Sequence, residues 1–451
     1  MDIAEDWIKN SNEVLTINLD VSDSSGKGKE VGEGPDKSHV FNPDFTYPIY
    51  GDIETIIGYK DLQLNLKMDA STLLPLVTMS FTERLERDGV FFDDPVKKLL
   101  EHLPEETATD ESDWEERRAK ELADGFKPVG EDVGSFSADG EKYTVYRSTL
   151  DDPETLKLHM RLRIFVLLFI EAGSFIDNED DRWEIYFVYN SNNEIVGFST
   201  VYCYWFLEPS VKQEKAPKDA SLEQLKKQPF SPTLRKRISQ FVILPPHQGK
   251  GIGGHLYSLL FRRFHADPNV YEVTVEDPSE AFDDLRDRCD LKWLTDQGFS
   301  SEVFKMLQTT SAQGTKPGEV VVGKSKIVAG EFWTQWLEEH RMKYKMVDRQ
   351  FYRCFEMILL ACLEVPSPSK KRNFKDSRLF IKKRVFMRNK EFLEDMESNA
   401  MVMSKLQETY ESMVEDFTRI MKPVLGYIKD ALRKRPREET SDEEAKRAKV
   451  E

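Results

Sequence analysis

Two kinds of hydrophobic pattern alternate along the middle of the chain, between residues 142 and 300. Runs of β-branched and aromatic residues predict strands there, and apolar residues spaced three or four positions apart predict helices. The predicted strands are 143–147, 183–189, 195–206, 237–244 and 270–276. The predicted helices are 155–171, 252–264 and 279–294. Because the polar residues 190–194 separate two of these strands, we expect a hairpin there, within a mixed α+β domain.

The segments before this domain differ from it in composition. Residues 1–38 contain a stretch of Gly, Ser and charged residues, and we expect them to form a flexible N-terminal segment. Residues 39–138 contain more aromatic and aliphatic side chains, an apolar–polar alternation around Leu64 and an acidic helical stretch near 101–116. This pattern predicts a smaller N-terminal α+β domain, followed by the core domain at 139–310.

After the core domain the periodicity becomes helical. Residues 311–432 are predicted to form a C-terminal helical domain, whose aromatic stripe at 332–365 we interpret as core packing. Residues 370–390 hold ten Lys or Arg and one Asp, which the basic solvent face of a helix explains as well as a nucleic-acid site does. We expect residues 433–451 to be a disordered tail and residues 209–233 a surface insertion.

The charge balance favours a cationic partner. The chain carries 81 acidic and 64 basic side chains, a formal net charge of −17. A field of this sign repels nucleic acid and attracts Lys-rich peptides, although acidity can also serve solubility alone. We therefore expect no direct binding to nucleic acid. The longest apolar run, 164–170, is far shorter than the ~20 residues that cross a bilayer, so we also expect no membrane association.

The use of cysteine points away from a metal site. The four cysteines are Cys203, Cys289, Cys354 and Cys362. They form no CxxC pair, and no His lies near them at the spacing of metal ligands. We therefore expect free thiols in a reducing compartment and no bound metal.

The segment from Ser239 to Gly254, SQFVILPPHQGKGIGG, joins an apolar strand to an amphipathic helix through a Gly-rich turn. Glycines allow the backbone to approach a phosphate closely, and the first N–H groups of a helix have no partner within it. Together with the helix dipole they form a site for a diphosphate. The spacing Gln248-x-x-Gly251-x-Gly253 resembles the acetyl-CoA signature of the GNAT acetyltransferase fold.

Two other interpretations of this turn are open. Gly249, Gly251 and Gly254 also match the dinucleotide fingerprint, and Glu276 follows the last of them by 22 residues, near where a ribose-binding acid is expected. Against this match, the residues PPHQ separate the strand from the first glycine, and helices rather than further βα units follow the motif. A purely structural glycine turn is the other alternative. The coenzyme interpretation accounts for most of the pattern.

Acetyl transfer to an amine also requires a base. A lysine ammonium, with a pKa near ~10.4, is almost entirely protonated at neutral pH, so a side chain must remove its proton. Glu276 is the candidate, because it stands at the carboxyl end of the strand after the motif helix, and Asp277 beside it could share the task. Helix capping is the alternative role for either acid. The backbone of Phe241, Val242 and Ile243 is our candidate for holding the thioester and the pantetheine arm.

Several further segments resemble the catalytic subunit of type B histone acetyltransferases. They are Tyr50–Glu54, Gly58–Tyr59, Ala172–Asp177, Asp180–Trp183, Thr200–Tyr202, Ser239–Gln240, Glu276–Phe282 and Leu285–Asp287. The resemblance implies an α+β fold: a GNAT core with a mixed, mostly antiparallel sheet flanked by helices, an N-terminal α+β domain and a C-terminal helical domain. It further implies acetylation of lysines on the N-terminal tail of newly made histone 4, with acetyl-CoA as co-substrate and no metal.

The resemblance also implies roles for individual residues. Glu276 is implied as the general base, with Asp277 beside it. The implied coenzyme contacts are Phe241, Val242, Ile243, Gln248, Gly249, Lys250, Gly251, Ile252, Gly253, Gly254, Ser279 and Arg288. The implied histone contacts are Asp52, Ile53, Glu54, Tyr202, Cys203 and Tyr204. Acids and aromatic rings suit a Lys-rich tail through ion pairs and cation–π contacts, although plain surface charge is the alternative for the two acids.

Partner, location and substrate are further expectations. The resemblance implies a WD-repeat histone-binding subunit as partner. Arg433–Arg437 and Lys446–Lys449 look like a bipartite nuclear import signal, so we expect the chain in nucleus and cytoplasm, with a solvated charged tail as the alternative. The alternative functions are a GNAT enzyme for other proteins or small amines, and a histone-binding chaperone without turnover.

Overall fold

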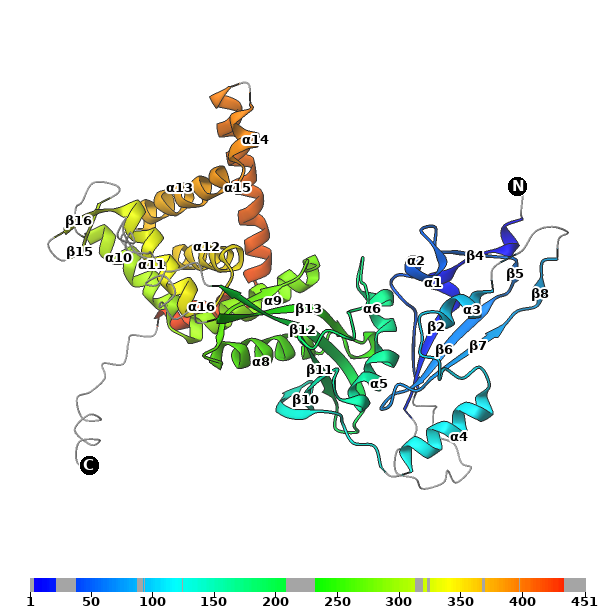
Figure 1. Cartoon of the computed structure of the whole chain (residues 1–451). Helices are drawn as coiled ribbons and strands as arrows, with labels where there is room; N and C mark the ends of the chain where they lie inside the picture. Colours follow the sequence, from blue (N-terminus) through cyan, green and yellow to red (C-terminus); the bar gives the residue numbers. More distant parts are fainter. Residues whose placement is uncertain are drawn as a thin grey trace, which may run out of the picture. The chain divides into compact units, whose positions relative to one another are not determined.

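The structure is a computed structural model of the whole chain (Figure 1). It describes residues 4–21, 38–86, 92, 94–123, 125–207, 232–312, 319–322, 325–366, 370–396 and 398–433. Apart from Arg433, the expected disordered tail lies outside these residues, as does almost all of the expected insertion. The chain divides into two compact units, Met1–Asp277 and Pro278–Glu451.

A four-stranded sheet forms the N-terminal part of the first unit. Its order is β3 (His39–Phe41), β2 (Leu15–Asp20), β6 (Gln63–Asp69) and β7 (Pro75–Ser80). β2 runs parallel to β6, and its Leu15, Ile17 and Leu19 are at most 1% exposed. The prediction that residues 1–38 form a flexible segment is therefore wrong for β2, because its alternating apolar residues hold it inside the sheet.

Short elements surround this sheet. They are η1 (Glu5–Trp7), β1 (Ile8–Asn10), α1 (Ser11–Val14), α2 (Tyr47–Tyr50), β4 (Thr55–Ile57), β5 (Tyr59–Lys60), β8 (Glu83–Arg84) and α3 (Pro95–Leu100). The acidic helix expected near 101–116 is α4, Glu111–Leu122, which starts later because Asp110 caps it by accepting a hydrogen bond from the Asp113 N–H. Buried Trp114 donates its ring N–H to the Leu74 carbonyl and so fixes α4 to the sheet.

Six strands form the central sheet of the first unit. In spatial order they are β14 (Val270–Val275), β13 (Pro232–Ile243), β12 (Ile195–Leu207), β11 (Trp183–Tyr189), β10 (Glu141–Thr149) and β9 (Glu131–Ala138). All neighbours are antiparallel except β13 and β14, which are parallel. Because β9 pairs with β10, the core domain begins at residue 131 and the predicted boundary at 139 is wrong. Gly134 and the serines of β9 dilute its apolar pattern.

Helices cover both faces of the central sheet (Figure 1). On one face, α5 (Pro153–Leu162) and α6 (Ile164–Phe169) share a hydrophobic core with the odd-numbered residues of β11 and with the N-terminal sheet. On the other face lies α8 (Ile252–Ala266), whose Phe264 ring contacts the Tyr186 ring of β11 at 5.9 Å between centroids. Burial on both sides accounts for the unbroken apolar and aromatic sequence of β11.

Helices dominate the second unit. They are α9 (Glu280–Asp296), α10 (Phe299–Ala312), α11 (Ala329–Lys343), α12 (Asp348–Glu364), α13 (Lys370–Arg388), α14 (Lys390–Glu394), α15 (Asn399–Met421) and α16 (Leu425–Arg433). A hairpin, β15 (Glu319–Val322) and β16 (Ser325–Val328), precedes α11. Because α9 and α10 pack against α12 and α16, this unit begins at residue 278, and the predicted boundary at 311 is wrong.

The aromatic stripe of the second unit is confirmed as core. Phe299 is fully buried, and the rings of Trp336, Phe351 and Phe355 lie within 6.2 Å of it between centroids. The predicted α+β architecture is also confirmed: a core with a mixed, mostly antiparallel sheet flanked by helices, an N-terminal α+β part and a helical C-terminal unit.

Candidate active site

The Gly-rich turn between β13 and α8 has the backbone that a diphosphate site requires. Gly249 and Gly251 have φ angles of 74° and 82°, in the left-handed region that other residues adopt only with strain. Gly251 is the N-cap of α8, and an added Cβ at either glycine would meet nothing within 4 Å. The turn therefore presents an open surface at the positive end of a 15-residue helix, which suits an anion.

The rest of the turn is anchored from both sides. Ile252 is 1% exposed and fixes the first turn of α8 to the core. Gln248 donates its side-chain N–H to the Ile243 carbonyl at 2.8 Å, closing the turn onto the end of β13. Lys250 is partly buried, and Gly253 and Gly254 form the first turn of α8. All seven predicted residues from Gln248 to Gly254 thus belong to one exposed turn and the helix start that follows it.

A histidine pair supports the turn from beneath. His247 is 7% exposed, and its ring meets the His39 ring of β3 edge-on at 5.3 Å between centroids. Burial, with smaller contributions from the charges of His39 and Lys250, lowers the pKa of His247 to about 4. The ring is therefore neutral at physiological pH, and the turn depends on the N-terminal sheet for part of its support.

The buried imidazole should make the first unit sensitive to acid. In the unfolded chain His247 takes up a proton near pH 6.5, but in the folded chain only near pH 4, so the unfolded state binds more protons between these values. The free energy of unfolding of the first unit therefore decreases as the pH falls, by about 2 kcal/mol between pH 7 and pH 5. Urea unfolding at the two pH values measures this loss, and His247→Gln should remove most of it. The exposed His255, changed to Gln, is the control, and an unaltered pH dependence in His247→Gln would contradict the assignment.

The parallel pairing of β13 with β14 stops just before Glu276, the candidate base. Their pairing ends at Ile238 and Val275, whereas β12 continues to pair with β13 as far as Ile243. A bulge at Ser239 interrupts the β12–β13 register just after this point. Phe241, Val242 and Ile243 therefore lie on a stretch of β13 that, within the described residues, β14 does not cover. This position fits their predicted role beside an extended coenzyme arm.

Glu276 and Asp277 follow directly on β14. The Glu276 N–H donates to the Ile238 carbonyl at 2.9 Å, and its carboxylate Oε2 lies 3.4 Å from Nε of Arg237. Asp277 is exposed and has a φ of 31°. Neither acid caps the next helix, because Ser279 accepts the hydrogen bond from the Phe282 N–H at the start of α9. The capping alternative for the two acids is therefore wrong.

Ser279 and Arg288 have structural partners within the second unit. Ser279 is the N-cap of α9. Arg288 donates to the Asp284 carboxylate at 3.0 Å and to the Ile420 carbonyl at 3.3 Å. These contacts account for both residues without a coenzyme, and their role in binding one remains a prediction.

The tyrosine segment of β12 alternates between the two faces of the sheet. Tyr202 donates its hydroxyl to Oδ2 of Asp180 at 3.0 Å, and the guanidinium groups of Arg182 and Arg237 lie over its ring at 4.9 and 5.5 Å. The cation–π positions that we predicted for substrate lysines are thus already used by arginines at Tyr202. Burial, then the charge of Glu184, raises the pKa of the Cys203 thiol to about 12, so this thiol stays protonated at neutral pH.

Tyr204 and the loop at residues 52–54 complete the predicted histone contacts. The Arg235 guanidinium lies 5.6 Å from the Tyr204 ring. Glu54 accepts hydrogen bonds from the backbone N–H groups of Thr46 at 2.7 Å and Tyr47 at 3.1 Å, so it organises its own loop. Ile53 is 88% exposed and Asp52 is exposed beside it. These two side chains are therefore accessible to a peptide, whereas Glu54 has a structural role.

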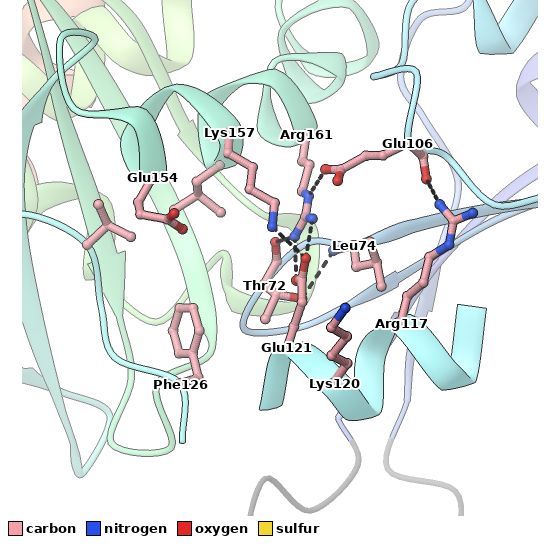
Figure 2. Close-up of a pocket in the computed structure, with 12 residues that line it drawn as sticks. Thr72, Leu74, Glu106, Arg117, Lys120, Glu121, Phe126, Glu154, Lys157 and Arg161 are labelled. Atoms are coloured by element: carbon pink, nitrogen blue, oxygen red, sulfur yellow. Dashed lines mark hydrogen bonds and ion pairs between the residues drawn. The ribbon is translucent and has the colours of Figure 1, made fainter. Parts of the chain in front are cut away.

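A cavity of about 510 Å³ lies between α4 and α5, and none of the predicted site residues lines it (Figure 2). Arg161, 3% exposed, lines it and binds Glu106, Glu121 and the Thr72 carbonyl. Lys157 adds a second contact to Glu121 at 2.7 Å. Burial opposes the ionisation of Glu121, but the hydrogen bonds from Arg161 and Lys157 outweigh it and lower the pKa of this carboxyl. We refer to Arg161, Lys157, Glu106 and Glu121 as the ion ladder. It joins the N-terminal part of the first unit to the central sheet.

No group of three or more His, Cys, Asp or Glu among the described residues could hold a metal ion. No helix in the described part of the chain is long and apolar enough to span a bilayer.

Comparison with known proteins identifies the family. The model "Histone acetyl transferase HAT1 N-terminus" matches residues 7–171, and "Fungal HAT1, C-terminal" matches residues 321–364. The histone acetyltransferase type B catalytic subunit of Yarrowia lipolytica is 74% identical over 451 residues, all of both chains. That of Candida albicans is 38% identical over 456 residues, 99% of this chain and 96% of its own. The chain belongs to the type B histone acetyltransferase catalytic subunit family.

A solved structure gives a weaker likeness than the sequence relatives of this family. The xEco2 acetyltransferase domain bound to a K105-CoA conjugate is 18% identical, with a TM-score of 0.23, over 34% of this chain and 87% of that chain.

Sequence reasoning missed three residues of the candidate site: Asp180, Arg182 and Arg237. Two of them lie in the Asp180–Trp183 segment that carried the resemblance to the type B family. Their contacts with Tyr202 depend on strand register, for which the sequence has no signal.

Proposed function

We propose that this chain is an acetyl-CoA-dependent N-acetyltransferase for lysine side chains on the N-terminal tail of histone 4. One observation carries the chemistry: the Gly249–Gly251 turn continues β13, and Glu276 continues the adjacent parallel strand β14. A coenzyme bound at the turn and a substrate beside the carboxylate can then meet where these strands part. The names of the two relatives, which are type B histone acetyltransferase catalytic subunits, support a histone as substrate.

Each group of the site has a defined task in this proposal. The N–H groups at the start of α8 bind the diphosphate, and the β13 stretch Phe241–Ile243 lies along the pantetheine arm. Acetyl-CoA supplies the thioester whose acetyl group is transferred. The Glu276 carboxylate accepts a proton from the lysine ammonium, which leaves the nitrogen lone pair free to attack. As the nitrogen bonds to the acetyl carbon and the C–S bond breaks, the nitrogen loses its second proton and the sulfur takes one up, so the coenzyme leaves as the thiol.

An assay with two amine substrates tests this function. The full chain, acetyl-CoA and a histone 4 N-terminal peptide should release coenzyme A and add acetyl groups to lysines, located by mass spectrometry. The same peptide with every lysine changed to arginine is the control, and free spermidine is the competing substrate. Turnover on spermidine but not on the peptide would favour the small-amine alternative. Binding of the peptide without any turnover would favour the chaperone alternative.

We also propose a WD-repeat histone-binding subunit as partner. The relatives are named catalytic subunits, which supports the existence of a second subunit. Such a subunit would hold the histone body and raise the local concentration of the tail. Adding it to the assay should therefore lower the KM for whole histone 4 and leave the KM for the short tail peptide unchanged.

A further inference from the structure

Arg237 lies between the candidate base and the aromatic residues of β12. Its position on β13 is paired with Tyr202 on one side and with Thr274 of β14 on the other. Its Nε lies 3.4 Å from Oε2 of Glu276, and its guanidinium carbon lies 5.5 Å from the centroid of the Tyr202 ring. The ion pair with Glu276 and the ring of Tyr202 thus place the guanidinium beside the carboxylate.

The ring against which Arg237 rests is itself held in place. The Tyr202 hydroxyl donates to Asp180 Oδ2 at 3.0 Å, and the Trp183 ring packs on Tyr202 at 4.7 Å between centroids. Arg182 lies over the same ring and binds Asp180 through Nη2 at 2.6 Å. Arg237 thus belongs to a connected arrangement of side chains, unlike an isolated surface arginine.

The charge of Arg237 changes which form of a lysine the site favours. A lone carboxylate attracts an ammonium group, but the nitrogen of that ion pair has no lone pair with which to attack a thioester. Beside Arg237 the carboxylate charge is already balanced, so a neutral amine leaves the site uncharged, whereas an ammonium adds a positive charge without a counterion. The Arg237 and Glu276 side chains are 34% and 40% exposed, so solvent screening keeps this effect moderate.

We propose that Arg237 is a positioning residue for acetyl transfer, which holds the Glu276 carboxylate and disfavours the charged form of the substrate amine beside it. This rests on the proposed function, in which Glu276 accepts the amine proton. The proton moves from nitrogen to a carboxylate oxygen and from there to solvent, and Arg237 stays charged throughout. Arg237 then acts through Glu276 and through the protonation state of the substrate.

Kinetics of Arg237→Met in the full chain test this role with the histone 4 peptide. We expect kcat to fall about tenfold and the KM for the peptide to fall about threefold, because the ammonium form binds better and reacts less. A residue that only maintained the fold would raise KM or lower the unfolding midpoint. Arg237→Lys keeps the charge and should retain kcat within about threefold of the unmodified chain. The matched control is Arg263→Met on α8, which removes a 40% exposed arginine outside the site and should change neither constant.

Repeating the Arg237→Met change in the Glu276→Gln variant distinguishes failure of this inference from failure of the proposed function. In Glu276→Gln, the additional Arg237→Met change should lower kcat by less than about twofold, because no carboxylate is left to position. Full activity of Glu276→Gln would overturn the base assignment and, with it, this role. A large loss in Glu276→Gln together with a normal kcat, or a raised KM, in Arg237→Met would overturn only the role of Arg237. An equal loss of kcat in both backgrounds would overturn it as well.

Discussion

Glu276→Gln should lower kcat for acetyl transfer by about 10²-fold or more while leaving acetyl-CoA binding nearly unchanged. The amide has almost the shape of the carboxylate but cannot accept the proton of a lysine ammonium at neutral pH. Because the Glu276 backbone N–H binds the Ile238 carbonyl and its side chain is 40% exposed, the fold should tolerate the change. Steady-state kinetics with the histone 4 peptide and calorimetric titration with acetyl-CoA measure the two effects separately.

Asp277→Asn is the matched control for this prediction. Asp277 is the next residue, also carries a carboxylate and is also exposed, but its backbone leaves the strand with a φ of 31°. We expect its loss to cost less than about tenfold in kcat, because an auxiliary charge contributes less than a proton acceptor. If Asp277→Asn abolished activity and Glu276→Gln did not, the two acids would have to exchange roles.

Arg161→Met should destabilise the first unit by about 3–5 kcal/mol, because it removes the central cation of the ion ladder. The Arg161 side chain is 3% exposed, and its loss removes the guanidinium from Glu106 and from the buried Thr72 carbonyl, whereas Glu121 stays paired with Lys157. Figure 2 shows Arg161 with its contacts to Glu106 and Glu121, beside the contact of Lys157 with Glu121. Urea unfolding gives the overall loss, and hydrogen exchange in peptides from α4 and α5 should show the greatest increase in rate.

Arg117→Met is the matched control for the ladder. Arg117 lines the same cavity, but its side chain is 46% exposed and pairs with Asp113 in the i,i+4 position on α4. Exposed pairs of this kind contribute at most about 1 kcal/mol, so we expect little change in stability. Equal losses in Arg117→Met and Arg161→Met would mean that the cavity wall as a whole, and not the buried ladder, carries the stability.

The sequence predicted the fold correctly where both faces of a strand are buried, and where the residues that form a turn are contiguous in the chain. β11 was predicted to the residue, because both of its faces are buried and its run of apolar and aromatic residues is unbroken. β2 was missed because its partner β6 lies far along the chain, and β9 was missed because Gly134 and its serines dilute the apolar pattern. The start of the second unit was also missed, since the periodicity of α9 does not reveal which helices it packs against.

The candidate site likewise has a part that the sequence predicted and a part that it did not. The Gly-rich turn and Glu276 were predictable, because a phosphate-binding turn and a base at a strand end are contiguous in sequence. The position of Arg237 beside Glu276 was not, because it follows from the parallel register of β13 on β14. The structural role of Glu54 was likewise hidden, since its partners Thr46 and Tyr47 become neighbours only once α2 has formed. Residue types revealed the chemistry, whereas strand pairing decides which side chains act together.

The placement of β2 has a practical consequence for anyone who shortens this protein. Its three fully enclosed aliphatic side chains fill the gap between β3 and β6, and His39 at the start of β3 in turn braces the glycine turn through His247. A version trimmed to begin at residue 38 would lose the strand that joins these two neighbours. It would expose the apolar edge of β6 to aggregation and leave the coenzyme turn without its brace.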